Sequence, residues 1–269
     1  MTDKTLRIGV VGAYGRMGRE VCKTVDAAPD MDLVLAIDKE GVGTCVRDFT
    51  SQHAPDISIK DRLSESIERV GEVDAIVDFT HPKVAAHHAL VALKHGVSPI
   101  VGTSGLTVSD LTSMRSLSEE QGVAAAYIPN FAIGAVLMMK FAMEAAKHLP
   151  ECEIIEMHHE KKADAPSGTA TRTAELIASA RLRRPDRGRT DMVRIEGVRG
   201  GSVGETPIHS VRLPGLLAHQ MVIFGGQGEV LTLRHDSMDR SSFMAGVLVA
   251  LRAIKSKQGL IIGLENLLD

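Results

Sequence analysis

The feature that most constrains the fold is a glycine motif set between an apolar run and a helical pattern. Residues 12–18 read G-A-Y-G-R-M-G. The run before them, Leu6–Gly12, is β-branched and nearly continuous in apolar residues, which is typical of a buried parallel strand. Arg16–Ala28 has helical spacing and stops at Pro29, and Leu33–Ile37 is again strand-like. Together these segments predict a β-α-β unit of about 30 residues.

The same alternation continues through the first half of the chain. Strands are expected at Asp74–Phe79, Ser98–Val101 and Val123–Ile128, with helices at Lys83–His95 and Val108–Gln121 between them. Alternating strands and helices predict a Rossmann-like, doubly wound parallel sheet of the α/β class. Each strand is followed by small or polar residues, and open α/β sheets bind ligands at that edge.

The pattern changes after a long helix expected at Ile133–His148. One good helix, Thr169–Ala180, stands among short strand-like segments and glycine-rich turns, which predict a second, α+β domain with a mixed β-sheet. A final helix, Ser241–Lys255, needs an apolar partner, and we expect it to return to the first domain. The predicted domains are therefore 1–130 with 240–269, and 131–239. The expected strands of the second domain are Glu153–His158, Met192–Val198, Ile208–Leu213, Gln220–Phe224 and Val230–Arg234.

In this context the glycine motif predicts a dinucleotide site. Its glycines permit a tight turn, close approach of a pyrophosphate and close helix–strand packing. Asp38 stands 20 residues after Gly18, where a carboxylate can accept hydrogen bonds from the ribose hydroxyls of NAD. Lys39 and Arg16 could each pair with the 2′-phosphate of NADP, or Lys39 is simply a solvated surface lysine. The cofactor is thus NADH and/or NADPH, with the preference open. The predicted contacts are Gly12, Ala13, Tyr14, Gly15, Arg16, Met17, Asp38 and Lys39.

A dense charged stretch in the second half points to acid–base chemistry. Residues 156–169 read E-M-H-H-E-K-K-A-D-A-P-S-G-T, after a strand end and before a helix start. The N–H groups and dipole of a helix N-terminus favour anions such as carboxylates. Protonatable side chains beside such a site predict proton transfer to a carboxylate substrate.

Composition excludes several other classes of function. The net charge of −3, the pI near 6.4 and the 3% aromatic content give no case for nucleic acid or an anionic membrane as partner. Cys22, Cys45 and Cys152 are far apart in sequence, so we expect no metal site and a reducing, cytoplasmic location. The uncharged segment Gln121–Met139 contains Pro129-Asn130, which separates a strand from a helix and argues against a membrane span.

Several motifs in order along the chain carry a family resemblance. The sequence closely resembles the dihydrodipicolinate reductases (4-hydroxy-tetrahydrodipicolinate reductases), bacterial and plant enzymes of diaminopimelate and lysine biosynthesis. The H-H-x-x-K-x-D-A-P-S-G-T element is the most specific part of the resemblance. The matching segments are G-A-Y-G-R-M-G at 12–18, D-F-T-H-P at 78–82, V-G-T-S-G at 101–105, P-N-F-A-I-G at 129–134, E-M-H-H-E-K-K-A-D-A-P-S-G-T-A at 156–170 and H-D-S-M-D-R at 235–240.

The resemblance implies hydride transfer from NADH or NADPH to 4-hydroxy-tetrahydrodipicolinate, a cyclic dicarboxylate, giving tetrahydrodipicolinate. It implies that the second domain binds substrate and builds a homotetramer. By the family motif, His158 is the proton donor and Lys162 assists it, since Lys162 and not Lys161 stands in the K-x-D-A-P register. The implied substrate-carboxylate sites are His159, Ser167, Gly168 and Thr169, and the implied loops around the nicotinamide are Gly102, Thr103, Ser104, Ile128, Pro129, Asn130 and Phe131.

Alternatives remain beside this interpretation. The family often has serine where Ala132 stands, so a contact by that hydroxyl is absent. If the strand continues, His158 and His159 point to opposite sides and one of them is merely packed or exposed. A different two-domain dehydrogenase would place other acid–base groups after its sheet, and a nucleotide-sensing scaffold would be expected to lose His158 or Lys162. The histidines near an expected helix start are interpreted as structural or exposed, with His81 a candidate neighbour of the cofactor phosphates: His81, His87 and His88.

Overall fold

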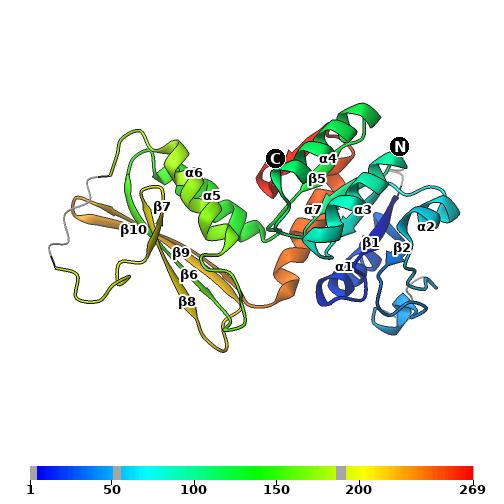
Figure 1. Cartoon of the computed structure of the whole chain (residues 1–269), viewed down its shortest axis with the longest axis horizontal. Coiled ribbons are helices and arrows are strands. Elements are labelled where there is room, and N and C mark those ends of the chain that lie inside the picture. The colour runs from blue at the N-terminus through cyan, green and yellow to red at the C-terminus, as the bar shows by residue number, and fades with distance from the viewer. Residues whose placement is uncertain (1–4, 51–55, 186–191, 269) are drawn as a thin grey trace. The chain divides into compact units, whose positions relative to one another are not determined.

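The computed structural model describes residues 5–50, 56–185 and 192–268. The chain divides into two compact units (Figure 1). Unit 1 comprises residues 1–131 and 243–269, and unit 2 comprises residues 132–242. The C-terminal segment therefore belongs to the same unit as the N-terminal half.

Unit 1 contains a six-stranded parallel sheet with the order β11-β5-β4-β3-β1-β2. All residues of β3 and β4 are buried, as expected for parallel strands covered by helices on both faces. Helices α3 and α4 contact each other, and α1 contacts α7 (Figure 1). The strands are β1 (Leu6–Val11), β2 (Met31–Ile37), β3 (Ala75–Asp78), β4 (Ser98–Val101), β5 (Ala125–Tyr127) and β11 (Leu260–Ile262). The helices are α1 (Arg16–Asp26), α2 (Leu63–Val70), α3 (Pro82–Lys94), α4 (Val108–Gln121) and α7 (Met244–Ile254), with 3-10 turns η1 (Val46–Asp48) and η3 (Leu264–Asn266).

Local sequence signals set the helix boundaries of this unit. Pro82 occupies the first turn of α3, where its missing N–H leaves no hydrogen bond unmade. Thr107 and Asp110 form a reciprocal capping box at the start of α4. Gly122 ends α4 in the left-handed region, with φ of 62°. These positions explain why the spacing-based helices of unit 1 agree closely with the structure.

Unit 2 contains a five-stranded mixed sheet with the order β10-β9-β6-β8-β7. Strand β6 is parallel to β8 and antiparallel to β9. The described elements are α5 (Ile133–Ala145), β6 (Glu151–His158), α6 (Gly168–Ala180), β7 (Gly201–Val203), β8 (Thr206–Arg212), β9 (Ala218–Gly226), β10 (Glu229–Ser237) and the 3-10 turn η2 (Arg240–Phe243).

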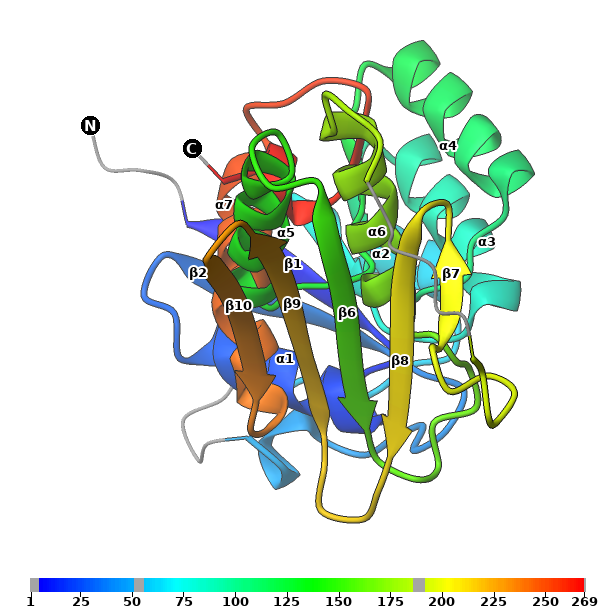
Figure 2. The ribbon, with the colours of Figure 1, turned by 90° about the vertical axis from the view of Figure 1, so that its left-hand side faces the viewer.

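Helices α5 and α6 cover one face of this second sheet. The core holds Met138 and Ala142 of α5, Ala174 and Ile177 of α6, and alternate strand residues such as Ile154. The residues between them in the strands point to the other face, because side chains alternate along a strand. Figure 2 shows the strands of this sheet in front of α5 and α6. Half-buried apolar side chains on the outward face are Ile155, Met157, Val211, Met221 and Ile223.

The predicted strand at Met192–Val198 is wrong. The described residues of this segment form bends and turns, and Val193 and Ile195 are 56% and 70% exposed. The short strand β7 lies instead at Gly201–Val203, where a glycine-rich turn was expected, and pairs with β8. An apolar run forms a strand only where another strand offers hydrogen bonds and one face is buried. Met192–Val198 is exposed throughout, and none of the strands in the described part of the chain pairs with it.

Two further elements of unit 1 were not expected from the sequence. The eight-residue helix α2 and the three-residue strand β11 are too short to give a clear periodicity. Strand β11 pairs with β5 and so forms an edge of the parallel sheet. None of the described helices is long and apolar enough to cross a membrane.

Candidate functional site

The glycine motif forms the turn between β1 and α1. Gly12 has φ of +83°, in the left-handed region that favours glycine, and its N–H donates to the carbonyl of Ile37 at 2.8 Å. A Cβ on Gly18 would lie 1.9 Å from the carbonyl oxygen of Gly12, so helix α1 can approach the turn only with glycine there. Gly12 therefore permits the tight turn, and Gly18 permits the close packing of α1 on that turn, as the motif predicts.

Asp38 holds this turn from the end of β2. Its Oδ2 accepts the N–H of Tyr14 at 2.9 Å and its Oδ1 accepts the N–H of Glu40 at 3.0 Å. Each carboxylate oxygen has a second lone pair, so both remain able to accept a ribose hydroxyl. Lys39 and Arg16 are exposed. The expected cofactor residues of this turn thus gather at the carboxyl ends of β1 and β2.

The two loops expected around the nicotinamide also lie side by side, at the ends of β4 and β5. The N–H of Ile128 donates to the carbonyl of Val101 at 2.9 Å. A Cβ on Gly102 would lie 2.4 Å from the ring of Phe79 and 2.9 Å from that of Phe131. These two rings contact each other with centroids 5.4 Å apart. Glycine at position 102 therefore lets one loop lie against an aromatic pair that includes the other loop.

A buried carboxylate fixes the first of these loops. Asp78, at the end of β3, is 1% exposed and its Oδ2 lies 2.7 Å from Nδ1 of His88. Its Oδ1 accepts hydrogen bonds from the backbone N–H and hydroxyl of Thr80 at 2.8 and 2.6 Å, and from the hydroxyl of Thr103 at 3.3 Å. The backbone carbonyl of Asp78 accepts the N–H of Gly102 at 2.9 Å. Both Gly102 and Thr103 are thereby attached to one residue.

The other histidines near α3 have simpler roles. His81 caps the helix, where its Nδ1 accepts the N–H of Lys83 at 3.3 Å, and its side chain is exposed together with that of His87. His88 is the one that contacts a buried carboxylate. Sequence reasoning missed this pair, although the spacing offered a signal: a strand end and the second turn of the following helix commonly face each other in a β-α unit.

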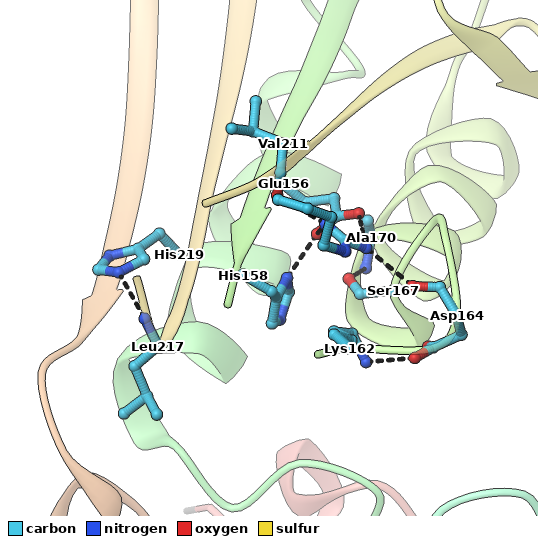
Figure 3. A network of polar contacts seen from close by, with 10 residues as sticks. Glu156, His158, Lys162, Asp164, Ser167, Ala170, Val211, Leu217 and His219 are labelled. Atoms are coloured by element: carbon cyan, nitrogen blue, oxygen red, sulfur yellow. Dashed lines mark hydrogen bonds and ion pairs between the residues drawn. The ribbon is translucent and has the colours of Figure 1, made fainter. Parts of the chain in front are cut away.

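In unit 2 the charged cluster is built on the end of β6 (Figure 3). His158 is the last residue of the strand, and its side chain is 14% exposed. Its Nδ1 lies 2.5 Å from Oε2 of Glu156, two residues earlier on the same face of the strand. Glu156 itself is fully buried. A histidine at the rim of a sheet is thus anchored to a carboxylate beneath it.

Arg212 of β8 completes this pair. It stands opposite His158 in the register of the two strands. Its Nη2 donates to Oε1 of Glu156 at 2.7 Å and its Nη1 to Oε2 at 3.0 Å, which is a bidentate ion pair. Burial alone would raise the pKa of Glu156, but hydrogen bonds from His158, Arg212 and Ser210 outweigh burial and lower this pKa to about 2. Glu156 is therefore ionised at any pH at which the protein works.

Lys162 joins the same network through the loop after β6. Its Nζ donates to Oδ1 of Asp164 at 2.6 Å, and the carbonyl of Asp164 accepts a hydrogen bond from Nη2 of Arg212 at 2.8 Å. Burial tends to raise the pKa of the Asp164 carboxyl, but the hydrogen bond from Lys162 lowers it overall. A chain of direct contacts thus runs from His158 through Glu156, Arg212 and Asp164 to Lys162.

The start of α6 lies beside this cluster (Figure 3). Ser167 is its N-cap, 3% exposed, and the serine hydroxyl accepts the N–H of Ala170 at 3.2 Å. Gly168 and Thr169 are the next residues of the helix, whose first-turn N–H groups favour an anion. His159 follows the end of β6, is half-buried, and its carbonyl accepts the N–H of Lys162 at 3.1 Å. The structure therefore groups His158, Lys162 and the Ser167 turn. Sequence reasoning included Glu156 in the charged stretch without giving it a role, and it missed Arg212.

Comparison with known proteins identifies the family of the chain. The family model described as "Dihydrodipicolinate reductase, N-terminus" matches residues 6–131, and the model for the C-terminus matches residues 134–268. The chain belongs to the dihydrodipicolinate reductase family. The resemblance stated from the sequence motifs is thereby confirmed, as are the oxidoreductase class and the use of NAD(P)H that characterise this family.

Individual dihydrodipicolinate reductases are similar along their full length. The 4-hydroxy-tetrahydrodipicolinate reductase of Syntrophomonas wolfei is 48% identical over 262 residues, covering 97% of this chain and 98% of that protein. The enzyme of the same name from Listeria monocytogenes is 47% identical over 264 residues, covering 98% and 100%. These likenesses confirm, at the level of the family, the expected place in lysine and diaminopimelate biosynthesis.

Solved structures support the fold. The dipicolinate-bound dihydrodipicolinate reductase of Paenisporosarcina sp. TG-14 superposes with a TM-score of 0.85 at 40% identity, covering 98% of this chain and 100% of that chain. An amine dehydrogenase from Mycobacterium smegmatis has a TM-score of 0.70 at 13% identity, covering 97% and 95%, and shows the fold alone. The predicted combination of a Rossmann-like sheet and a second domain with a mixed sheet is confirmed.

Proposed function

We propose that this reductase transfers hydride from NADH or NADPH to 4-hydroxy-tetrahydrodipicolinate, with His158 as the proton donor and Lys162 assisting. The observation that supports these roles best is that His158 contacts the buried Glu156, which forms an ion pair with Arg212. This group lies beside the start of α6 (Figure 3). A protonatable side chain is there held at the rim of the sheet, beside backbone N–H groups suited to a carboxylate.

The chemistry requires a proton donor of this kind. Hydride addition to the conjugated C=C–C=N system of the dehydrated ring leaves electron density that a proton must neutralise. Histidine is suited to the task, since an unperturbed imidazole titrates near neutral pH. Nδ1 of His158 is taken by Glu156, so Nε2 is the nitrogen left to give the proton to substrate. Lys162, cationic and 23% exposed, would stabilise the developing negative charge.

The substrate carboxylates have two proposed contacts. One would accept the N–H groups of Gly168 and Thr169 at the first turn of α6, with Ser167 shaping that turn. The other would pair with His159. The dipicolinate held by the Paenisporosarcina enzyme is a planar ring dicarboxylate, and binding of such a ligand by a 40% identical relative supports this assignment.

The cofactor has a proposed site on unit 1. The turn at residues 12–17 would carry the pyrophosphate, Asp38 the adenosine ribose, and the loops 102–104 and 128–131 the nicotinamide. Because Lys39 and Arg16 are exposed near this ribose position, we expect both cofactors to work. Lys39→Ala should raise KM for NADPH several-fold more than KM for NADH, since a 2′-phosphate is attracted by a nearby cation. Equal changes for the two cofactors would show that Lys39 does not read the phosphate.

Assembly and location are further parts of the proposal. A homotetramer is supported by the sheet face of unit 2 opposite α5 and α6 (Figure 2). Five half-buried apolar side chains lie on this face by strand register: Ile155, Met157, Val211, Met221 and Ile223. A cytoplasmic location is supported by three free cysteines, which suit a reducing compartment. Sedimentation equilibrium of the wild-type protein tests the tetramer, and a monomer at micromolar concentration would refute it.

The reaction is tested with substrate generated in place by dihydrodipicolinate synthase. Consumption of NADH and of NADPH is followed by the loss of nicotinamide absorbance, with synthase alone as the control. Substrate-dependent oxidation of either cofactor is the expected result. Oxidation of neither would contradict the proposed reaction.

A further inference from the structure

We propose that Glu156 is the positioning residue of the proton donor: together with Arg212 it fixes the ring of His158 so that Nε2 faces the substrate. This inference rests on the proposed role of His158. It gives a positioning role to Glu156 and Arg212, which are not among the proposed substrate and cofactor contacts. It is carried by burial, by a short contact and by a bidentate ion pair within unit 2.

The place of Glu156 in the sheet is not explained by packing. It lies on the helix-covered face of β6, two residues after the fully buried Ile154. Removing a carboxylate from water is unfavourable unless cations or hydrogen bonds compensate it, and an apolar side chain would fill this position at less cost. Glu156 is compensated by the guanidinium of Arg212 on one side and by the imidazole of His158 on the other.

The contact selects one nitrogen of His158. A carboxylate on Nδ1 keeps a proton on that atom, because Glu156 is ionised and can only accept. The exchangeable proton of the imidazolium is then the one on Nε2. The same contact restricts rotation of the ring, and a restricted acid stays within reach of the substrate atom that it protonates. Glu156 therefore acts through His158 and needs no contact of its own with the substrate.

The charged and titratable groups around His158 show why the negative charge of Glu156 matters. On its own strand His158 meets Glu156, and across from it on β8 stands Arg212. On β9 the opposite residue is Ala218. The loop after β6 contributes Lys162 and Asp164, which contact each other (Figure 3), and His159, while Glu160 and Lys161 of the same loop are exposed. On β10, His235 lies on the same face of the sheet, against α5. Glu156 is the carboxylate with a direct contact to the ring, so its loss leaves cations in excess.

Arg212 also connects Glu156 to the loop that carries Lys162, the second predicted catalytic side chain. Its Nη2 bonds both Glu156 and the backbone carbonyl of Asp164, and the Asp164 carboxylate accepts from Lys162. One guanidinium thus attaches the loop that carries Lys162 to the residue that holds His158. Together with the hydrogen bond from the Lys162 N–H to the His159 carbonyl, this contact places Lys162 relative to His158.

A double-mutant cycle tests the assignment. Glu156→Gln, His158→Gln and the double variant are compared with wild type in the coupled assay. We expect Glu156→Gln to lower kcat by about 10- to 100-fold and KM for NADH to stay within about two-fold. In the His158→Gln background the same substitution should have almost no further effect on kcat. Equal losses in both backgrounds would mean that Glu156 acts independently of His158 and would overturn the proposal.

The pH profile gives a second readout that a purely structural role would not move. Without the carboxylate, the imidazolium loses its counter-charge and faces the uncompensated guanidinium of Arg212, so the protonated form is disfavoured. The alkaline limb of the kcat profile should therefore move to lower pH in Glu156→Gln. The nitrogen chemical shifts of His158 in a ring-labelled sample should report Nδ1–H in wild type and a mixture of tautomers in the variant. An unmoved limb with unchanged shifts would overturn the proposal.

The same strand supplies a matched control. Glu153 lies on the opposite face of β6 and contacts Arg199 and, at 2.8 Å, His209, so it is also a carboxylate between an arginine and a histidine. Glu153→Gln should leave kcat and the pH profile as in wild type, once its oligomeric state has been shown to match. If Glu156→Gln unfolds, Glu156→Asp retains the charge but shortens the reach. Its loss of kcat must likewise vanish in the His158→Gln background, and persistence there would also refute the proposal.

These results are separable from the proposed reaction. If wild type shows no substrate-dependent oxidation, the reaction is wrong whatever Glu156 does. If wild type is active and His158→Gln retains its kcat, His158 is not the donor. With an active wild type and an impaired His158→Gln, additive losses, or an unmoved pH limb with unchanged nitrogen shifts, refute the role of Glu156 alone.

Discussion

The two units each bury one carboxylate against a histidine, but the carboxylates differ in their other partners. Asp78 in unit 1 is 1% exposed and lies 2.7 Å from Nδ1 of His88. Glu156 in unit 2 is fully buried and lies 2.5 Å from Nδ1 of His158. Hydroxyl and backbone N–H groups of neighbouring threonines satisfy Asp78, whereas the guanidinium of Arg212 satisfies Glu156.

This difference in partners indicates different roles: Asp78 fixes the conformation of a loop, whereas Glu156 places a negative charge beside a proton donor. Besides His88, the partners of Asp78 are hydroxyl and backbone N–H donors, and the Thr103 hydroxyl and the Gly102 N–H belong to the loop proposed to carry the nicotinamide, so their main effect is to fix that loop. The partner of Glu156 is a cation whose charge keeps the carboxylate ionised beside a side chain that must gain and lose a proton. A carboxylate–histidine pair therefore fixes a loop in unit 1 and supports the proposed proton transfer in unit 2.

The largest expected effect is on turnover when the unit 2 histidine is replaced. His158→Gln should lower kcat by about 10²–10⁴-fold, because an amide cannot donate the proton that neutralises the reduced ring. The matched change in unit 1, His88→Gln, should leave kcat within about three-fold. Both are measured in the coupled assay at saturating cofactor. Similar losses of kcat in the two variants would abolish the distinction between the pairs.

The next effect is on stability. Arg212→Met leaves Glu156 buried without its cation, which should lower the free energy of unfolding by about 3–5 kcal/mol in urea titrations. The double variant Glu156→Met/Arg212→Met should recover most of that loss, because an apolar pair needs no charge compensation. It should remain poorly active, since His158 loses its anchor. A double variant as unstable as Arg212→Met would show that the guanidinium stabilises the fold by packing and not by charge.

A smaller effect concerns acid. The pKa of Glu156 is about 2 in the folded protein and ordinarily 4.5, so its ionised form stabilises the folded state above pH 4.5. This stabilisation is lost as pH falls through the interval from 4.5 to about 2, and amounts to about 3 kcal/mol. Urea titrations across this interval should show a shallower decline in Glu156→Met/Arg212→Met than in wild type. Parallel declines would indicate that other carboxylates govern the acid response.

The smallest effect tests the unit 1 network on cofactor affinity. His88→Gln keeps a hydrogen-bonding group near Asp78 but loosens the carboxylate that accepts the Thr103 hydroxyl, on the residue whose backbone carbonyl holds Gly102. KM for NADH should rise by about 2- to 5-fold, equivalent to less than about 1 kcal/mol, with kcat nearly retained. The measurement is initial rate against cofactor concentration, with His87→Gln on the exposed face of α3 as control. An unchanged KM would indicate that the loop keeps its shape without His88.

Much of unit 1 could be predicted because its signals are local. Buried strand segments, the glycine turn and the caps of α3 and α4 all lie within a few residues of the elements they define. The segment from Glu156 to Thr169 was singled out for the same reason, because its charged residues and helix start follow one another directly. The roles of its side chains stay predictions. Unit 2 was harder, since Met192–Val198 has a strand-like composition but pairs with none of the strands described for the chain, while β7 is a strand only because β8 lies beside it.

The sequence by itself determined the alternation of strands and helices, the glycine turn and the position of the charged cluster after a strand. Only the tertiary structure decided which partners these residues meet. Arg212 reaches Glu156 from 56 residues away because β6 and β8 are parallel neighbours in one particular register. Thr103 reaches Asp78 from 25 residues away because β3 and β4 end at the same edge of the sheet. The local sequence of one strand does not show which distant strand it will pair with. The partners of both buried carboxylates therefore follow from the register of the two sheets.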